Sequence, residues 1–361
     1  MTRLRPRPGI LEIEPYVGGK AEAAGVARAI KLSANESPLG PSPHAIAALQ
    51  ASAPEAHRYP DGGAERLGRA IGARFDLDPA RIVCGAGSDE LIQLLMRAYA
   101  GPGDEVLYSA HGFLMYRLNA LGVGATPVAA PERALTADVD ALLARASSRT
   151  RMVFLANPNN PTGSYLAADE LARLHAGLPE DVLLVIDAAY AEYVRRNDYT
   201  AGFDLVDRAD NVVVTRTFSK LFGLAALRLG WLYARPPVVD VLHRIRGPFN
   251  VSTPAQVAGI AALDDLEHQE RARAHNERWL PWLAERLSGL RLEAHPSVAN
   301  FVLVGFDDSA RDAATASAWL EQRGVLARAM AAYGLPGYLR LSVGLENENR
   351  AAIRALQEFM A

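Results

Sequence analysis

The feature that most constrains the fold is the alternation of short apolar runs with helical stretches between Arg81 and Trp231. The apolar runs have strand length and are RIVCGAG, DEVLYSA, GATPVAA, RMVFLAN, VLLVIDAAY and NVVVTRTFS. Helical stretches between them include DELIQLLMRAYAG, FLMYRLNALG, DVDALLARAS and AADELARLHAGL. Strands that alternate with helices need crossover connections, so we expect an α/β fold with a mostly parallel central sheet flanked by helices. RLGWLYA follows its predecessor so closely that it predicts a further, antiparallel strand.

The pattern changes after Pro254, where a long helical segment ends near Leu290 and Pro281 predicts a kink or break within it. The remaining segments predict strands at NFVLVGF and YLRLSVG and helices at ATASAWLEQRG and NRAAIRALQEFM. These elements indicate a smaller α+β domain. A chain of 361 residues is long enough for two domains. We expect an N-terminal arm with part of the small domain over 1–40, a large domain carrying the candidate site over 41–250, and a small C-terminal domain over 251–361.

Composition excludes several classes of partner. The net charge is -3 and no dense basic tract occurs, which argues against a nucleic-acid partner. The basic opening MTRLRPRPGI is not followed by an apolar segment of signal-peptide length, and no run approaches the roughly 18 apolar residues of a membrane span. Cys84 is the single cysteine, so no internal disulfide and no cysteine-based metal site is expected. We therefore expect a cytoplasmic protein without a membrane partner or a metal.

Lys220 is unusual because it is one of three lysines in a chain with 38 basic residues. It follows the strand NVVVTRTFS and has Phe218 and Leu221 close by, with Arg228 eight residues later. A lysine that is partly desolvated beside another cation loses its proton more readily, and can then act as a nucleophile or base. The alternative is a solvated surface side chain.

Three other strand ends carry polar residues. Asp187 ends a strongly apolar strand, where a carboxylate is costly unless a cation or hydrogen bonds accompany it. NPNNPTG ends another strand in a turn, and GAGSDE combines a glycine turn with a helix start whose amides suit a phosphate. Asp187, Ser88 and Asp89 could instead be helix caps. In open α/β sheets ligands gather beyond the carboxyl ends of the strands. An aspartate for a protonated pyridine nitrogen, a lysine for an imine and a phosphate cradle together describe a pyridoxal phosphate site.

Longer segments carry a family resemblance. NPNNPTG, VIDAAYAEY, RTFSK and LRLGW resemble the cofactor signatures of the fold-type I pyridoxal-phosphate aminotransferases. SANESPLGPSP, RYPDGG, GAGSDE, FLMYRLNALG, RGPFNVS and YGLPGYLRLSVGLENEN are similar to the histidinol-phosphate aminotransferases, and they cover nearly the whole chain. Three departures concern the substrate rather than the cofactor. Gly18 replaces a usual proline, His111 and Gly112 stand where Pro-Thr precedes the aromatic residue, and ARAM stands where Arg-Pro is common.

The resemblance implies roles for individual residues. Lys220 would bind pyridoxal 5'-phosphate covalently and move a proton, Asp187 would keep the ring nitrogen protonated, and Asn160 and Tyr190 would hydrogen-bond the ring oxygen. The further cofactor contacts that it implies are Phe113 on the ring face, Ser88, Asp89, Thr217, Ser219 and Arg228 at the phosphate, and Tyr59 from the second subunit of a homodimer. The substrate-binding residues that it implies are Tyr16, Tyr59, Asn160, Arg328 and Arg340, with the two arginines binding phosphate or carboxylate.

These observations predict transamination of L-histidinol phosphate with 2-oxoglutarate, giving imidazole acetol phosphate and L-glutamate, in histidine biosynthesis. An aromatic amino acid aminotransferase with the same site is the alternative, and a related threonine-phosphate decarboxylase would share the cofactor. A pyridoxal-phosphate-binding regulator is disfavoured because the chain offers no DNA-binding segment. A nucleotide-binding oxidoreductase is disfavoured because GAGSDE lacks the third glycine of G-x-G-x-x-G and Lys220 would be unexplained.

Overall fold

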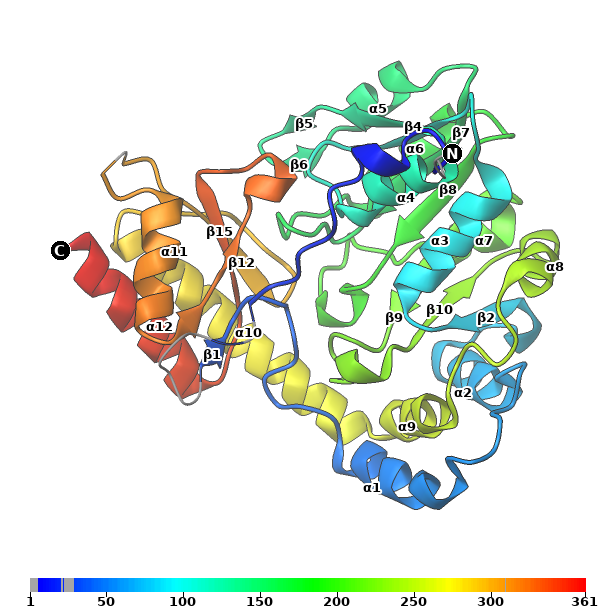
Figure 1. Cartoon of the computed structure of the whole chain (residues 1–361), viewed down its shortest axis with the longest axis horizontal. Helices are drawn as coiled ribbons and strands as arrows, with labels where there is room; N and C mark the ends of the chain where they lie inside the picture. The colour runs from blue at the N-terminus through cyan, green and yellow to red at the C-terminus, as the bar shows by residue number, and fades with distance from the viewer. Residues whose placement is uncertain (1–5, 21, 23–28, 309) are drawn as a thin grey trace, which may run out of the picture.

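A computed structural model describes residues 6–20, 22, 29–308 and 310–361 (Figure 1). Its centre is a seven-stranded sheet in the order β2-β10-β9-β8-β7-β3-β4. The strands are β2 (Ile82–Gly85), β3 (Glu105–Ser109), β4 (Thr126–Ala130), β7 (Thr150–Ala156), β8 (Leu183–Asp187), β9 (Val212–Thr217) and β10 (Gly230–Tyr233). Strand β10 runs antiparallel to β2 and β9, and the other neighbours are parallel. The predicted α/β fold is confirmed, including the antiparallel strand.

Side chains alternate across this sheet and build two cores, as the two-residue period of a strand requires. On β8, Leu184 and Ile186 belong to one core, and Leu183 and Val185 belong to the other. The first core also contains residues of α2 (Glu65–Phe75), α5 (Val139–Arg145), α6 (Ala168–Gly177), α7 (Phe203–Arg208) and α9 (Thr253–Asp264). The second contains residues of α3 (Ser88–Tyr99), α4 (Met115–Val123) and α8 (Pro236–Ile245). Because both faces are covered, the sheet presents its strand ends to ligands.

A smaller four-stranded sheet, in the order β11-β12-β15-β14, lies beside the first (Figure 1). Its elements are β11 (Glu293–Ala294), β12 (Phe301–Gly305), β14 (Arg328–Ala329) and β15 (Tyr338–Ser342), with α10 (Leu266–Gly289), α11 (Ala313–Gln322) and α12 (Glu346–Met360) packed on one face. On the other face, Phe301 packs with Tyr190 and Leu221 of the large-sheet region. Arg340 pairs with Leu303 across β12 and β15, so strand alternation directs it to this same face.

Helix α10 corrects one expectation. It runs unbroken through Pro281, and the helix boundary lies instead at Asp265, whose side chain accepts a hydrogen bond from the His268 amide. Of the kink or break predicted at Pro281, the break is therefore wrong. Proline removes one backbone donor, but Trp279 and Leu283 on either side are buried in the core of the small sheet. This packing keeps the segment helical.

The remaining elements are short apart from α1 (Pro43–Ser52). Strand β1 (Ile30–Lys31) pairs in parallel with β13 (Val325–Leu326), and β5 (Glu132–Arg133) forms a hairpin with β6 (Thr136–Ala137). The 3-10 helices are η1 (Ile10–Glu12), η2 (Ala53–Glu55), η3 (Pro79–Arg81), η4 (Ala191–Tyr193), η5 (Ala225–Leu227) and η6 (Ala331–Tyr333). Residues 1–5 of the basic opening and residues 21 and 23–28 of the predicted arm lie outside the described residues.

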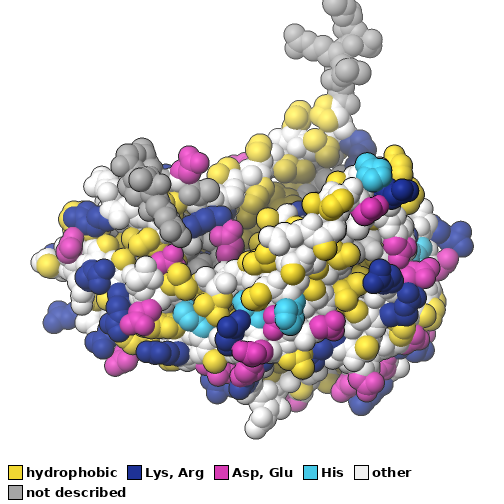
Figure 2. All heavy atoms as spheres, turned by 90° about the horizontal axis from the view of Figure 1, so that it is seen from below, with side chains coloured by type: hydrophobic (Ala, Val, Ile, Leu, Met, Phe, Trp, Pro, Cys, Tyr) yellow, Lys and Arg dark blue, Asp and Glu magenta, His cyan; other side chains and the backbone are white. Residues whose placement is uncertain are grey.

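The division into domains stays a prediction. We propose one refinement, because Ala255 and Ala258 of α9 are buried in the core of the large sheet together with Trp231. This packing favours a boundary at the start of α10 rather than at 251. Within the described ranges, no helix is long and apolar enough to cross a membrane. On the face drawn in Figure 2, basic and acidic side chains are interspersed among apolar ones.

Candidate active site

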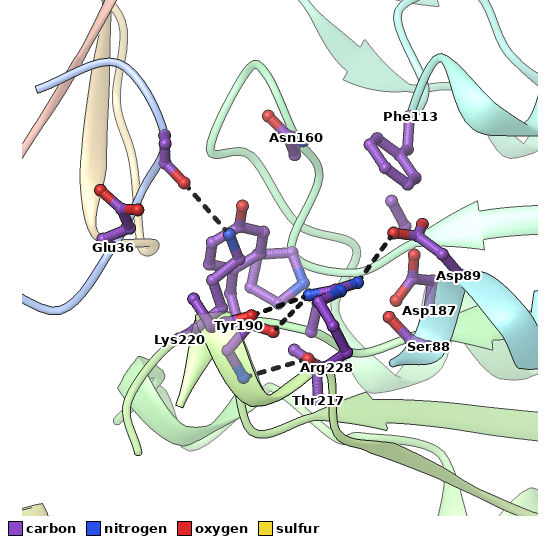
Figure 3. Close-up of a pocket in the computed structure, with 16 residues that line it drawn as sticks. Glu36, Ser88, Asp89, Phe113, Asn160, Asp187, Tyr190, Thr217, Lys220 and Arg228 are labelled. Atoms are coloured by element: carbon purple, nitrogen blue, oxygen red, sulfur yellow. Dashed lines mark hydrogen bonds and ion pairs between the residues drawn. The ribbon is translucent and has the colours of Figure 1, made fainter. Parts of the chain in front are cut away.

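A cavity of about 240 Å³ lies where the carboxyl ends of the parallel strands face the small sheet. The predicted residues that line it are Ser88, Asp89, Phe113, Asn160, Asp187, Tyr190, Thr217, Ser219, Lys220 and Arg228 (Figure 3). Segments far apart in the chain thus bring most of the predicted site together. Tyr16, Tyr59, Arg328 and Arg340 are not among the lining residues. In the described part of the chain, no group of three or more His, Cys, Asp and Glu side chains is arranged to hold a metal ion.

Lys220 reaches into this cavity from the segment after β9. Its Nζ donates to the Ala34 carbonyl at 3.4 Å and lies 5.5 Å from the centre of the Tyr190 ring. Burial, together with the charge of Arg340, lowers the pKa of Lys220 from 10.5 to about 8. A substantial neutral fraction near physiological pH makes this amine a candidate nucleophile and proton carrier.

Asp187 ends β8 and is 5 % exposed. Its two carboxylate oxygens accept hydrogen bonds from the Tyr116 hydroxyl at 2.8 Å and the Thr215 hydroxyl at 3.2 Å. Thr215 is the register partner of Asp187 on β9, which explains that contact. Burial raises the pKa of Asp187 to about 6, although the Tyr116 hydrogen bond opposes the increase. The carboxylate is therefore held in place, and a cationic ligand beside it would favour its ionised form.

The part of the cavity wall formed by Arg228 and the start of α3 is built for an anion. Gly87 precedes α3 with φ 88°, no side chain caps this helix start, and a Cβ on Gly87 would lie 2.6 Å from Nη2 of Arg228. A Cβ on Gly230 would overlap the Ser88 amide nitrogen. The two glycines therefore leave space in which Arg228 and the first amides of α3 converge. A helix N-terminus with a nearby guanidinium group is a favourable phosphate site.

Arg228 itself has a left-handed backbone conformation, with φ 49°. This conformation is uncommon for a residue with a side chain and is often retained at functional sites. Its guanidinium group donates to the Ser219 hydroxyl at 3.5 Å and lies 3.4 Å from an oxygen of Asp89. Figure 3 shows the Arg228 side chain directed toward Asp89, with Ser88 close to Asp89. The Arg228 guanidinium and the Ser219 hydroxyl are donors of the kind that a phosphate requires, whereas the Asp89 carboxylate accepts from Arg228.

The asparagines of NPNNPTG have separate contacts. Asn157 is fully buried, and its amide exchanges two hydrogen bonds with the backbone of Leu166. Asn159 donates to the His111 carbonyl at 3.2 Å. Asn160 accepts a hydrogen bond from Arg340 through Oδ1, which leaves its Nδ2 group as a donor toward the cavity. A turn alone would explain none of these residue types, so the motif both shapes the loop and supplies the site.

Arg340 lies just outside the lining residues and is 5 % exposed. It donates to Asn160 and, at 3.0 Å, to the Ser33 carbonyl. Its buried Nε atom has no hydrogen-bond partner among the residues that the structure describes. A buried donor without a partner is costly, and an anion would satisfy it.

The other three predicted substrate contacts lie farther out. Arg328 donates to the Val17 carbonyl at 2.6 Å and lies 5.7 Å from the Tyr16 ring, so both belong to a contact between the N-terminal segment and β14. Tyr59 is 82 % exposed and stacks on Phe249 with ring centres 4.7 Å apart. Within one chain, these residues therefore do not complete the cavity.

Sequence reasoning missed several site residues. Ala34 and Glu36 line the cavity, and the buried Asn35 between them donates to the Tyr190 hydroxyl at 2.9 Å. Tyr116 was not singled out, although its hydroxyl holds Asp187. The segment SANESPLGPSP, which carries part of the family resemblance, contains the signal for Asn35 and Glu36.

Comparison with known proteins agrees with this geometry. Residues 27–356 match the family described as aminotransferase class I and II, so the chain belongs to that family. Within it, the chain is similar over nearly its whole length to histidinol-phosphate aminotransferases. One from Rhodospirillum centenum is 62% identical and covers 98% of both chains. Another, from Paramagnetospirillum magneticum, is 59% identical over 100% of this chain and 99% of its own. The resemblance inferred from the sequence is confirmed.

A solved structure supports the same assignment. The histidinol-phosphate aminotransferase from Sinorhizobium meliloti, determined in complex with pyridoxal-5'-phosphate, has a TM-score of 0.90 to this chain and is 29% identical. The match covers 100% of this chain and 98% of that structure. An aspartate aminotransferase from Thermus thermophilus, at 23% identity and a TM-score of 0.80 over 92% of this chain and 91% of its own, shares the fold.

Proposed function

We propose that the chain transfers an amino group from L-histidinol phosphate to 2-oxoglutarate, giving imidazole acetol phosphate and L-glutamate in histidine biosynthesis. The observation that carries the proposal is the shared cavity of Lys220, Asp187 and Arg228 in a chain 62% identical to a histidinol-phosphate aminotransferase. The relatives do not favour the aromatic amino acid aminotransferase as the primary function.

Pyridoxal phosphate fits the residues present. The anion site of Arg228 and the α3 amides suits its phosphate, the buried Asp187 carboxylate suits a protonated ring nitrogen, and Lys220 supplies an amine of lowered pKa. When bound, this cofactor supplies an aldehyde that condenses with amines and a cationic ring that accepts electrons from the substrate carbon.

The residues around the cavity would divide the work. Lys220 would hold the cofactor covalently, and its freed amine would carry a proton to and from the substrate carbon. Asp187 would keep the ring nitrogen protonated, because an opposed carboxylate stabilises the cation. Tyr190 and Asn160 would donate to the ring oxygen, since Asn35 and Arg340 already occupy their acceptor oxygens. Each role uses a group that the fold already orients.

The other contacts would fix the cofactor and the substrate. Phe113 would cover a face of the ring, while the backbone amides of Ser88 and Asp89, together with Thr217, Ser219 and Arg228, would hold the phosphate. Arg340 and Arg328 would bind the phosphate of histidinol phosphate or the carboxylate of glutamate, because a planar guanidinium suits both anions. Tyr16 and Tyr59 would complete the substrate end.

We further propose a cytoplasmic homodimer in which Tyr59 reaches the phosphate of the partner's cofactor. Two aromatic side chains, Tyr59 and Phe249, stack on one another while remaining 82 % and 44 % exposed. Exposed apolar side chains that gather in this way are typical of protein interfaces. The partner subunit would also bring Tyr59 to a site that it cannot reach within its own chain.

The function is tested with purified protein, 2-oxoglutarate and a panel of amino donors. We expect kcat/KM for L-histidinol phosphate to exceed that for phenylalanine and tyrosine. One glutamate should form for each imidazole acetol phosphate. Higher kcat/KM for phenylalanine would identify the aromatic aminotransferase instead. Carbon dioxide release would identify a decarboxylase.

A further inference from the structure

A buried carboxylate anchors the segment that leads into Phe113. Glu132 of β5 has a side chain that is 3 % exposed, and its oxygens accept from three groups. The His111 ring donates through Nδ1 at 2.7 Å, the His111 amide donates at 3.0 Å, and the Ser109 hydroxyl donates as well. Burial opposes ionisation of Glu132, but these hydrogen bonds, the one from His111 foremost, lower the pKa of its carboxyl below the usual value.

His111 joins this anchor to the cavity. Its carbonyl accepts from Asn159, in the loop that carries Asn160. Phe113, two residues later, lines the cavity, and its ring meets the Tyr116 ring edge-on with centres 5.8 Å apart. Figure 3 shows the Phe113 ring across the cavity from Lys220. The segment from Ser109 to Tyr116 thus links Glu132 to the wall of the site.

Gly112 separates this anchor from Phe113. Glycine has the greatest backbone freedom of any residue, and here it stands directly before Phe113. The Gly112 amide donates to the Ser109 carbonyl at 2.7 Å, which holds the turn before Phe113 from one side. The direction of the Phe113 side chain needs a further restraint on the residue that precedes the glycine. The ring and amide of His111, both bound to one buried carboxylate, supply that restraint from the other side of the glycine.

We propose that His111, clamped by Glu132, is a positioning residue that fixes the Phe113 ring against the cofactor. This inference rests on the proposed function, because it requires pyridoxal phosphate in the cavity. His111 does not line the cavity and acts through Phe113. Loss of the clamp therefore weakens cofactor binding only while the Phe113 ring is present.

The test measures the Kd of pyridoxal phosphate for cofactor-free protein by quenching of intrinsic fluorescence. His111→Ala removes the ring donor of a charge-assisted hydrogen bond, and we expect the Kd to rise roughly tenfold. His111→Asn should restore most of the affinity, because its Nδ2 group can donate where Nδ1 does. His175→Ala is the matched control, since His175 makes a comparable side-chain contact with Asn211, at 3.0 Å, and lies outside the cavity lining.

A double-mutant cycle separates positioning from general destabilisation. If His111 acts through Phe113, the double variant His111→Ala/Phe113→Ala binds the cofactor no more weakly than Phe113→Ala alone. Independent, multiplying effects would overturn the proposal, as would an unchanged Kd in His111→Ala. Should His111→Ala fail to fold, Glu132→Gln replaces it in the cycle and is held to the same two outcomes. Wild-type protein that bound no pyridoxal phosphate would refute the proposed function itself.

Discussion

Lys220 and Asp187 share one cavity, and burial acts on their ionisation in opposite directions. Burial lowers the pKa of the lysine to about 8 and raises the pKa of the aspartate to about 6. Both shifts favour the neutral forms, as desolvation does in general. A cofactor with a cationic ring nitrogen and a carbonyl carbon would suit both groups, because its charge would stabilise the ionised Asp187 carboxylate and its carbonyl would react with the neutral Lys220 amine.

Lys220 gives a prediction about stability as well as activity. Its pKa falls from 10.5 when unfolded to about 8 when folded, so the unfolded chain binds more protons between these values and stability rises with pH across that window. Below pH 8 the charged lysine costs up to about 3 kcal/mol. We expect cofactor-free Lys220→Met to be more stable than wild type near neutral pH, with the difference shrinking from pH 8 to 10.5. Urea unfolding of both proteins across this pH range measures the difference in their free energies of unfolding.

We expect the same substitution to abolish turnover and the absorption band of covalently bound cofactor. A coloured, active Lys220→Met protein would remove Lys220 from the mechanism. A stability difference that did not change with pH would contradict the argument from burial. Lys31→Met is the control, because Lys31 forms an ion pair with Glu36 at 2.8 Å and has no proposed part in the chemistry.

Asp187→Asn tests the ring anchor. The amide keeps the size of the side chain but cannot stabilise a protonated ring nitrogen, so we expect the cofactor to bind while kcat falls by about 10²-fold or more. Absorption spectra measure cofactor loading, and steady-state assays measure kcat. Activity near the wild-type value in the loaded variant would exclude this role. Thr215→Val, which removes one hydrogen bond to Asp187, should have a smaller effect.

Arg340 gives the substrate prediction. Its buried Nε atom lacks a hydrogen-bond partner in the described structure, so a substrate anion could accept a hydrogen bond from it. We expect Arg340→Ala to raise KM for histidinol phosphate and for glutamate by about 10²-fold each, because one guanidinium serves both. Arg340→Lys keeps the positive charge but lacks the planar guanidinium group, so its KM values should lie between those of wild type and Arg340→Ala. An effect on neither substrate would place Arg340 outside the substrate site.

The residues that could be predicted from sequence share a simple origin. Asp187, Asn160 and Lys220 all follow recognisable apolar strands, and parallel strands end at one edge of the sheet. Tyr116 has no such signal, because a tyrosine on a buried helix face resembles any core residue. Its partner Asp187 is 71 residues away, so the contact depends on how α4 packs against the sheet. Local patterns therefore located the site but not all of its supports.

Helices and strands, like single residues, could be predicted where a local sequence pattern marks them. Long apolar strands of the large sheet were predicted because both faces are buried, whereas the two-residue strands β5 and β6 have too few residues for a pattern. The hairpin of β5 and β6 nevertheless carries Glu132, on which the inference about His111 depends. The break predicted at Pro281 is wrong for a related reason. Its effect on a helix is local, while the burial of Trp279 and Leu283 that preserves α10 is tertiary.

The start of α3 provides the prediction at this scale. A Cβ on Gly230 would overlap the Ser88 amide, so Gly230→Ala should displace the first turn of α3 at a cost of about 1–3 kcal/mol. We expect weaker binding of pyridoxal phosphate but unchanged binding of pyridoxal, which lacks the phosphate. Gly289→Ala is the control, because a Cβ there would meet nothing within 4 Å. Equal losses for both ligands would show that α3 does not hold the phosphate.

At the scale of the whole molecule, the cavity lies between two sheets with separate cores. The large sheet supplies Asp187 and Lys220, and the small sheet supplies Arg340, with Phe301 and Tyr190 packed across the junction. One chain still leaves Tyr59 exposed and away from the cavity. A second subunit is the simplest source of the missing contact, because symmetric dimers place equivalent residues reciprocally.

Mixed dimers test this arrangement. Lys220→Ala and Tyr59→Ala each damage the active sites of their own homodimer. If Tyr59 acts across the interface, a hybrid of the two variants has one site with both changes and one site with neither. Random exchange should then restore about a quarter of wild-type activity, since half of the dimers are hybrids with one intact site each. If Tyr59 acts within its own chain, every hybrid site carries one change, and mixing restores no activity beyond the mean of the two parents. Light scattering confirms that dimers are present, and native mass spectrometry, which resolves the hybrid from both parent dimers by its mass, confirms that subunits have exchanged.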